Sequence, residues 1–215
     1  MTSRGDNGTF LSSLRRRAAE QRRTVVYPEG DDPRILGAAA ECLREGLVAP
    51  VLIGDAELIF DGFRQRDADV SGVRVVSPDD DEILAHTLSH ARTRRADKDD
   101  PEDALRAMAA DALFQGAALV ARGDADGMVA GCVRTTADVV RAGLVCVGLD
   151  DGIETLSSSF YMVFEADHRV GPRVLTFTDA GVVPTPSPGQ LAEIAAAAVS
   201  ARRRIVGDEA RVDFL

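Results

Sequence analysis

The stretch "GMVAGCVRTTADVVR", residues 127–141, gathers side chains that are able to bind an anion. Its first five residues have the pattern of a short strand buried on both faces, and their two glycines let a ligand approach the backbone closely. Thr135 and Thr136 bring hydroxyls and backbone N–H groups to the start of a helix, which suits a negative charge. Arg141, five residues beyond Thr136, can add a bidentate guanidinium fork. The combination predicts a phosphate or phosphoryl site.

A plainer interpretation of the same residues stays open, in which Thr136 only caps a helix and Arg141 is exposed to solvent. Residue types alone favour neither interpretation. The chain contains no G-x-G-x-x-G and no Walker sequence, so nucleotide-binding folds that need those motifs have little support. It also contains no G-x-S-x-G elbow, so a hydrolase triad is not indicated.

Two further clusters carry chemistry-bearing side chains. Glu29, Asp31 and Asp32 are close enough in sequence to hold a metal, but carboxylates at the start of a helix more often cap it. His86 and His90 are spaced as on one helix face, but the glutamate of H-E-x-x-H is missing between them. We therefore predict no metal site.

Composition narrows the class of protein. The chain has 215 residues, of which 45% are hydrophobic, so it can bury a core. It has no apolar run of membrane-spanning length and no signal-peptide core, so we expect a cytoplasmic protein with no membrane partner. The net charge of −10 argues against a nucleic-acid partner. The three cysteines are far apart and odd in number, which favours free thiols over a zinc site or disulfides.

The elements that must position these side chains alternate between two periodicities. Strand-like runs span 24–30, 49–54, 73–78, 127–131, 157–164 and 173–181. Helical runs span 32–46, 80–95, 100–123 and 187–207. Asp32, Pro33 and Gly46 fit the cap, first turn and left-handed end of one helix, and Ser187 with Gln190 fits a capping box.

This alternation predicts an α/β fold with mostly parallel sheets and helices on both faces. We expect an N-terminal α/β domain over residues 1–145 and a partial second α/β domain over residues 146–215. The terminal "RVDFL" looks like the beginning of another strand. Because such a strand would leave an open apolar sheet edge, we expect a homo-oligomer.

Four segments of the chain resemble the phosphate acetyl/butyryl transferase family. The most specific is "DADGMVAGCVRTTADVVRAGL", which is similar to the family's A-D-G-x-V-x-G…T-T-A-D…R motif. The others, in order along the chain, are "VVYPEGDDPRILGAAAECLREGLVAPVLIGD", "SSSFYMV" and "TFTDAGVVPTPSPGQLAEIA". The resemblance covers the chain from about Thr24 to its end.

The resemblance implies transfer of an acyl group between coenzyme A and inorganic phosphate, by two α/β domains with the active site between them. It implies that Thr135, Thr136 and Arg141 line the phosphate and coenzyme A site. Arg92, from the "HARTRR" segment, would be a second anion contact. The expected ligands are coenzyme A, acyl phosphate and phosphate, all as substrates, with no bound cofactor.

The chain departs from the family pattern at several places. Ala142 stands where the family usually has Pro, Arg134 replaces a smaller or neutral residue, and "ADKDD" replaces a Lys-Gly pair. The family also continues past the equivalent of "RVDFL", with an acidic residue thought to act as base toward the thiol. The catalytic base is therefore expected beyond Leu215, and the catalytic residues within this chain are unknown.

These departures leave two functional hypotheses. The first is an acyltransferase that turns over slowly, unless Glu29, Asp126 or Asp138 replaces the base. The second is a non-catalytic, truncated paralogue that binds phosphate and coenzyme A or a full-length partner. A nicotinamide-linked enzyme of related two-domain shape is disfavoured, because the chain lacks a dinucleotide fingerprint.

Overall fold

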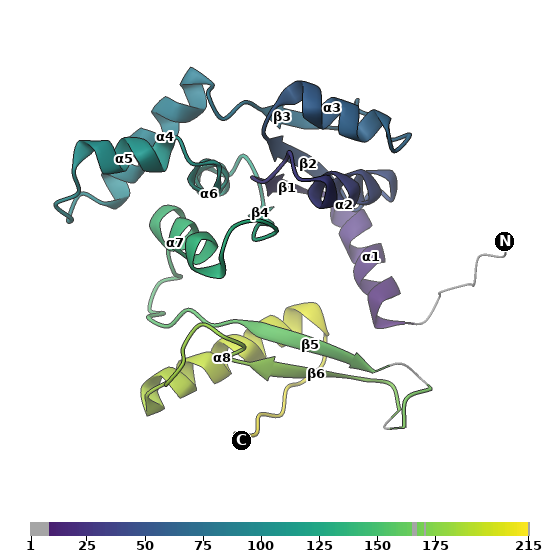
Figure 1. The fold of residues 1–215 in the computed structure, drawn as a ribbon. Helices are drawn as coiled ribbons and strands as arrows, with labels where there is room; N and C mark the ends of the chain where they lie inside the picture. The colour runs from purple at the N-terminus through teal and green to yellow at the C-terminus, as the bar shows by residue number, and fades with distance from the viewer. Residues whose placement is uncertain (1–8, 165–166, 170, 215) are drawn as a thin grey trace. The chain divides into compact units, whose positions relative to one another are not determined.

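The computed structural model describes residues 9–164, 167–169 and 171–214. Packing divides the chain into two compact units, the larger of which is Arg16–Gly148 (Figure 1). The smaller unit contains the chain from Leu149 onward together with the first half of helix α1 (Phe10–Gln21). The division after α7 (Thr136–Cys146) falls between Gly148 and Leu149, whereas the sequence suggested a boundary between residues 145 and 146.

A four-stranded parallel sheet forms the centre of the larger unit, with strand order β3-β2-β1-β4. Its strands are β1 (Arg23–Tyr27), β2 (Val48–Ile53), β3 (Arg74–Val76) and β4 (Gly127–Met128). The parallel sheet predicted from the alternating periodicities is confirmed. The strand predicted over 127–131 is shorter than expected, since only its first two residues pair with β1.

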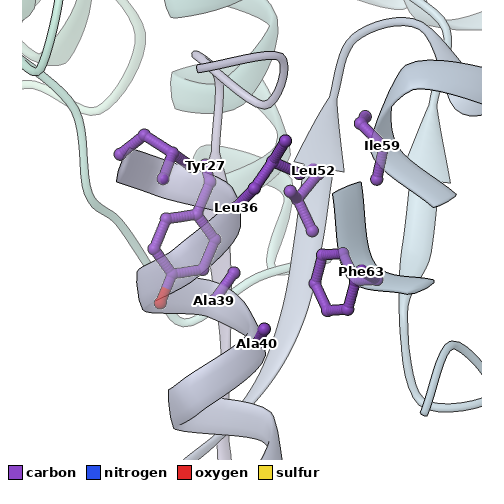
Figure 2. Packing of buried hydrophobic residues seen from close by; sticks show 8 residues of the cluster. Tyr27, Leu36, Ala39, Ala40, Leu52, Ile59 and Phe63 are labelled. Carbon is purple, nitrogen blue, oxygen red and sulfur yellow. The ribbon is translucent and has the colours of Figure 1, made fainter. Parts of the chain in front are cut away.

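Helices cover both faces of this sheet, because successive strand residues point to opposite sides. Tyr27 and Leu52 pack on one face against α2 (Pro33–Arg44) and α3 (Ala56–Arg64), as Figure 2 shows. Val26 and Val51 pack on the other face, in a cluster with residues of α4 (Asp81–Arg94) and α6 (Ala112–Arg122).

Local capping signals set the helix ends. Asp32 accepts the backbone N–H of Arg34, Pro33 opens α2, and Gly46 after the helix has a φ of +68°, as predicted. Helix α3 was not predicted. It begins after Asp55, whose side chain accepts a backbone N–H, and it buries Phe63 completely.

The helix predicted over 100–123 is wrong as a single element. It forms α5 (Glu102–Ala109) and α6, bent by 80° at the break. Asp111 caps α6 by accepting the N–H of Leu113, and the Gln115 amide donates to the Ala109 carbonyl across the bend. A capping aspartate inside the apolar stripe thus starts a new helix. No single described helix is long and apolar enough to cross a membrane, and only the bent α5–α6 pair has the combined length and composition.

The smaller unit contains β5 (Ser159–Phe164), β6 (Arg173–Thr178) and α8 (Pro188–Ile205), which begins with the predicted Ser187–Gln190 capping box. The strands β5 and β6 are antiparallel, so the mostly parallel arrangement expected for the chain does not include this pair. The physical reason is the connection over residues 165–172, which is too short for a parallel crossover of a dozen or more residues.

The C-terminal residues and the β5–β6 pair of this unit both bear on the predicted self-association. Residues 211–214 form no strand, so the strand predicted at "RVDFL" is wrong for the residues described, and Leu215 lies outside them. The β5–β6 pair instead presents an exposed apolar face. Phe160 pairs with Phe177 and Met162 pairs with Leu175, and all four side chains are exposed.

Candidate functional site

Two of the predicted anion-binding residues, Thr135 and Thr136, lie where β4 ends and α7 begins. This is the carboxyl edge of the sheet, where ligands of open α/β sheets bind. Thr135 is the N-cap of α7. Its hydroxyl donates to the Asp138 carboxylate at 2.8 Å and accepts the Asp138 backbone N–H at 3.2 Å. The Thr135 hydroxyl is therefore engaged in shaping the helix start.

Thr136 and Arg141 are both exposed on α7. Five residues of regular helix separate them, which places them roughly 140° apart around the axis. Helical side chains lean toward the N-terminus, so Arg141 extends along α7 toward Asp138 and the first turn. Within the part of the chain that the structure describes, no carboxylate forms an ion pair with Arg141. Its charge nevertheless helps to hold the pKa of Asp138 below the usual range, so an anion bound by this guanidinium would compete with the Asp138 carboxylate.

Arg92 lies on a different side of α4 from the residues that contact α7. Its guanidinium pairs with Glu102 of α5. His90 and Arg94, two residues to either side, instead contact backbone carbonyls in the last turn of α7, at 2.8 and 3.1 Å. The structure therefore does not bring Arg92 to the start of α7.

A residue that the sequence did not assign to this site organises the loop before α7. The Glu29 carboxylate accepts the backbone N–H groups of Gly131 and Cys132 on one oxygen, at 2.9 and 2.8 Å. Its other oxygen accepts the N–H groups of Val133 and Arg134, at 2.8 and 2.7 Å. Glu29 lies two residues after the end of β1, the neighbour of β4, so two adjacent parallel strands bring both partners to one edge of the sheet.

The electrostatics of Glu29 follow from these contacts. Partial burial acts to raise its pKa, but the four backbone N–H groups outweigh burial and hold the pKa of the carboxyl below its usual range. The carboxylate is therefore ionised at neutral pH. The sequence contained one signal for this role, a glutamate just after the strand β1. That signal did not reveal which N–H groups Glu29 would bind.

Two arginines tie the same loop to other elements. Arg34 donates to the Cys132 carbonyl at 2.9 Å while it pairs with Asp32. Arg134 makes a two-pronged contact with Asp111 at the start of α6, at 3.1 and 2.9 Å. Residues 131–134 are thus held from the turn after β1, from α2 and from the N-cap of α6.

The three carboxylates considered as a metal set bind separate partners in the structure. Glu29 binds the loop, Asp32 caps α2, and Asp31 accepts the backbone N–H of Asp55 at 2.9 Å. In the described ranges no three His, Cys, Asp or Glu side chains gather as metal ligands.

The other candidate replacement bases are similarly engaged. A hydrogen bond from the Thr135 hydroxyl holds the pKa of Asp138 below its usual range. The backbone N–H of Thr24, with help from Arg23, does the same for Asp126. A general base works best when its pKa lies near the operating pH. Lowered pKa values therefore make Glu29, Asp126 and Asp138 weak bases at neutral pH.

Two surface hollows are lined by residues that do not belong to this site. One, of ≈ 670 Å³, runs along α8 beside Ala196 and Val199. The other, of ≈ 210 Å³, lies beside β3 and the start of α4. Neither is lined by Thr135, Thr136 or Arg141, so we assign the candidate site from side-chain chemistry and position in the sheet.

The fold and the site together define an α/β protein with an anion-compatible loop and helix start at the carboxyl edge of a parallel sheet. Comparison with known proteins specifies the family. Residues 9–215 match the family model described as phosphate acetyl/butaryl transferase, and the chain belongs to this family. The resemblance seen in the sequence motifs is confirmed.

Individual relatives agree with this assignment. The chain is 34% identical to the phosphate acetyltransferase of Nitratidesulfovibrio vulgaris over 96% of its length, covering 28% of that protein. It is 31% identical to the phosphate acetyltransferase of Acetivibrio thermocellus, again over 96% of its length, covering 62% of that protein. The chain therefore spans less than two thirds of these relatives.

Solved structures show the same architecture. A phosphotransacetylase from Streptococcus pyogenes superimposes with a TM-score of 0.81 at 26% identity, over 96% of this chain and 60% of that one. The EutD phosphotransacetylase from Staphylococcus aureus gives a TM-score of 0.77 at 25% identity, over 92% and 58%.

Proposed function

We propose that the protein takes part in transferring an acetyl or other short acyl group between coenzyme A and inorganic phosphate. The observation that carries this proposal is the family match over residues 9–215. In the reaction the thiolate sulfur of coenzyme A attacks the acyl carbon of an acyl phosphate. The bond from that carbon to the phosphate oxygen breaks, and inorganic phosphate leaves with the electron pair.

In this proposal the phosphoryl group binds at the start of α7. The first N–H groups of a helix lack partners within the helix and carry partial positive charge, which suits a phosphate. Thr136 supplies a hydroxyl there and Arg141 supplies the guanidinium, while Thr135 shapes the first turn through Asp138. Arg92 would reach the phosphate only by leaving Glu102.

The rate gain would come from positioning and charge stabilisation. Holding the acyl phosphate against the thiolate converts a bimolecular encounter into an oriented one, and cations offset the charge of the departing phosphate. A free thiol has a pKa of about 8.5, so coenzyme A is mostly protonated at neutral pH. A positioned base typically contributes ~10²–10⁴-fold. Since Glu29, Asp126 and Asp138 are weak bases, we expect the chain alone to turn over slowly.

A second candidate is a non-catalytic protein that binds phosphate and coenzyme A or associates with a full-length relative. The hydrogen bonds to Glu29, Asp126 and Asp138 favour it, because they lower the pKa values of these carboxylates and make them weak bases.

A thiol-consumption assay separates the two candidates. The purified chain is mixed with acetyl phosphate and coenzyme A, and loss of free thiol is followed with and without a full-length relative inactivated by substitution. Turnover by the chain alone at the rate of an active relative would support the enzyme and refute our expectation of slow turnover. Phosphate binding without turnover in either mixture would support the second candidate. Absence of both binding and turnover would refute both.

A further inference from the structure

We propose that Glu29 is a positioning residue: its carboxylate holds residues 131–134 in the conformation that presents the start of α7 to phosphate. This inference rests on the proposed phosphate site. It assigns the site a component that comes from the turn after β1, about a hundred residues earlier in the chain.

The hydrogen bonds to Glu29 form a complete set. Four consecutive backbone N–H groups converge on one carboxylate, two on each oxygen, at 2.7 to 2.9 Å. An ionised carboxylate has about four lone-pair sites, so this one is saturated. Successive N–H groups that point into one concavity form an anion-binding nest. Here the bound anion is a side chain of the protein itself.

The loop depends on this contact because little else orders it. Val133 is 64% exposed, and Gly131 and Arg134 are also exposed, so the apolar anchoring of this segment rests on Cys132, which is partly buried against the cluster around Tyr27 and Leu52. Polar contacts to Glu29, Arg34 and Asp111 must therefore fix its path. Of these, the Glu29 carboxylate alone contacts every residue from 131 to 134.

The consequence for the site is direct. Thr135, the N-cap of α7, follows Arg134 without an intervening residue, so the clamped backbone sets the position and direction of the first turn. The opposing interpretation is that Glu29 fills a nest that phosphate would otherwise occupy. The two interpretations predict opposite effects when the carboxylate is weakened.

Two substitutions at this position differ in charge and in length. Glu29→Gln retains one acceptor oxygen but turns an NH₂ donor toward N–H groups, so two of the four donors lose their partner. Glu29→Asp keeps the charge and shortens the side chain by one methylene. Asp55→Ala is the matched control, because it removes a carboxylate that caps α3 and touches none of residues 131–134.

The experiment measures the affinity for inorganic phosphate by ³¹P NMR and the hydrogen exchange of the amides at 131–134. We expect Glu29→Gln to expose those amides and weaken phosphate binding about tenfold or more, which corresponds to at least ~1.4 kcal/mol. We expect Glu29→Asp to recover part of both losses. Asp55→Ala should lower the unfolding midpoint while leaving the phosphate affinity and these amides unchanged.

Each result bears on the inference. Unchanged or tighter phosphate binding in folded Glu29→Gln, with the parent binding phosphate, would overturn the positioning role and leave the proposed function intact. A parent that binds no phosphate would refute the proposed phosphate site and this inference with it, and a parent that also shows no turnover would refute the proposed function. If Glu29→Gln does not fold, Glu29→Asp decides: weaker binding with faster exchange at 131–134 supports the clamp, and parental values for both overturn it.

Discussion

Replacing Arg141 by Ala tests the proposed phosphate site most directly. Arg141 is exposed and forms no ion pair with a described carboxylate, so its removal leaves no buried charge behind. Asp138, one turn away, keeps its hydrogen bonds from Thr135. The free protein should therefore fold as before, and the loss should fall on the complex with phosphate.

The magnitude follows from the charge of the partner. A hydrogen bond to a charged group contributes roughly 1.5–3 kcal/mol, and each ~1.4 kcal/mol changes an affinity tenfold. We expect Arg141→Ala to weaken phosphate binding by about 10- to 100-fold, toward the lower end because the helix surface is solvated. Arg141→Lys should fall between, because it keeps the charge but loses the bidentate fork.

The assay is titration with inorganic phosphate at fixed ionic strength, with the far-UV spectrum as a check on folding. Arg44→Ala is the matched control, since it removes an exposed arginine that pairs with Glu41 at the end of α2. Arg92→Ala shows whether Arg92 stays paired with Glu102 or moves to bind phosphate. The phosphate affinity should be unchanged in the first case and weaker in the second. Parental phosphate affinity in Arg141→Ala would refute the assignment of this helix start as the site.

Three further outcomes follow from the structure. Phe63→Ala should lower the free energy of unfolding by about 3–5 kcal/mol in a urea titration, because the side chain is 0% exposed. A change as small as that of an ordinary surface substitution would contradict the described core. Burial raises the pKa of Asp179, but hydrogen bonds from Ser158 and from backbone N–H groups outweigh it and lower the pKa. Because the pKa of Asp179 is lower in the folded state, the ionised carboxylate stabilises the fold at neutral pH, and this stability is lost as the pH falls from roughly pH 5 to pH 1. Asp179→Asn should therefore flatten the dependence of the free energy of unfolding on pH in this range. An unaltered pH profile in the variant would contradict this prediction. The exposed Phe160 and Phe177 should drive self-association, so sedimentation velocity should show oligomers that the double substitution to Ser reduces, and a monomeric parent at micromolar concentration would count against this.

Much of the fold was predictable because its signals are local. The caps at Asp32 and Ser187 lie within a few residues of the backbone groups they satisfy, and the sequence alone located both. The alternation of strand and helix periods predicted the parallel sheet, since each period reflects which side chains must be buried. The helix break at Asp111 was missed although its capping contact is local, because the surrounding apolar stripe was continuous.

The sequence by itself determined the family motif, the helix start at Thr135 and Thr136, and the presence of Arg141 one to two turns later. The tertiary structure alone decided how these are held. Glu29 meets residues 131–134 only because β1 and β4 are neighbours in the sheet, and Arg92 turns to Glu102 because α4 packs against α5. Such contacts join residues far apart in the chain, so no spacing along the sequence encodes them. They arise when the burial of separate apolar faces brings distant elements together.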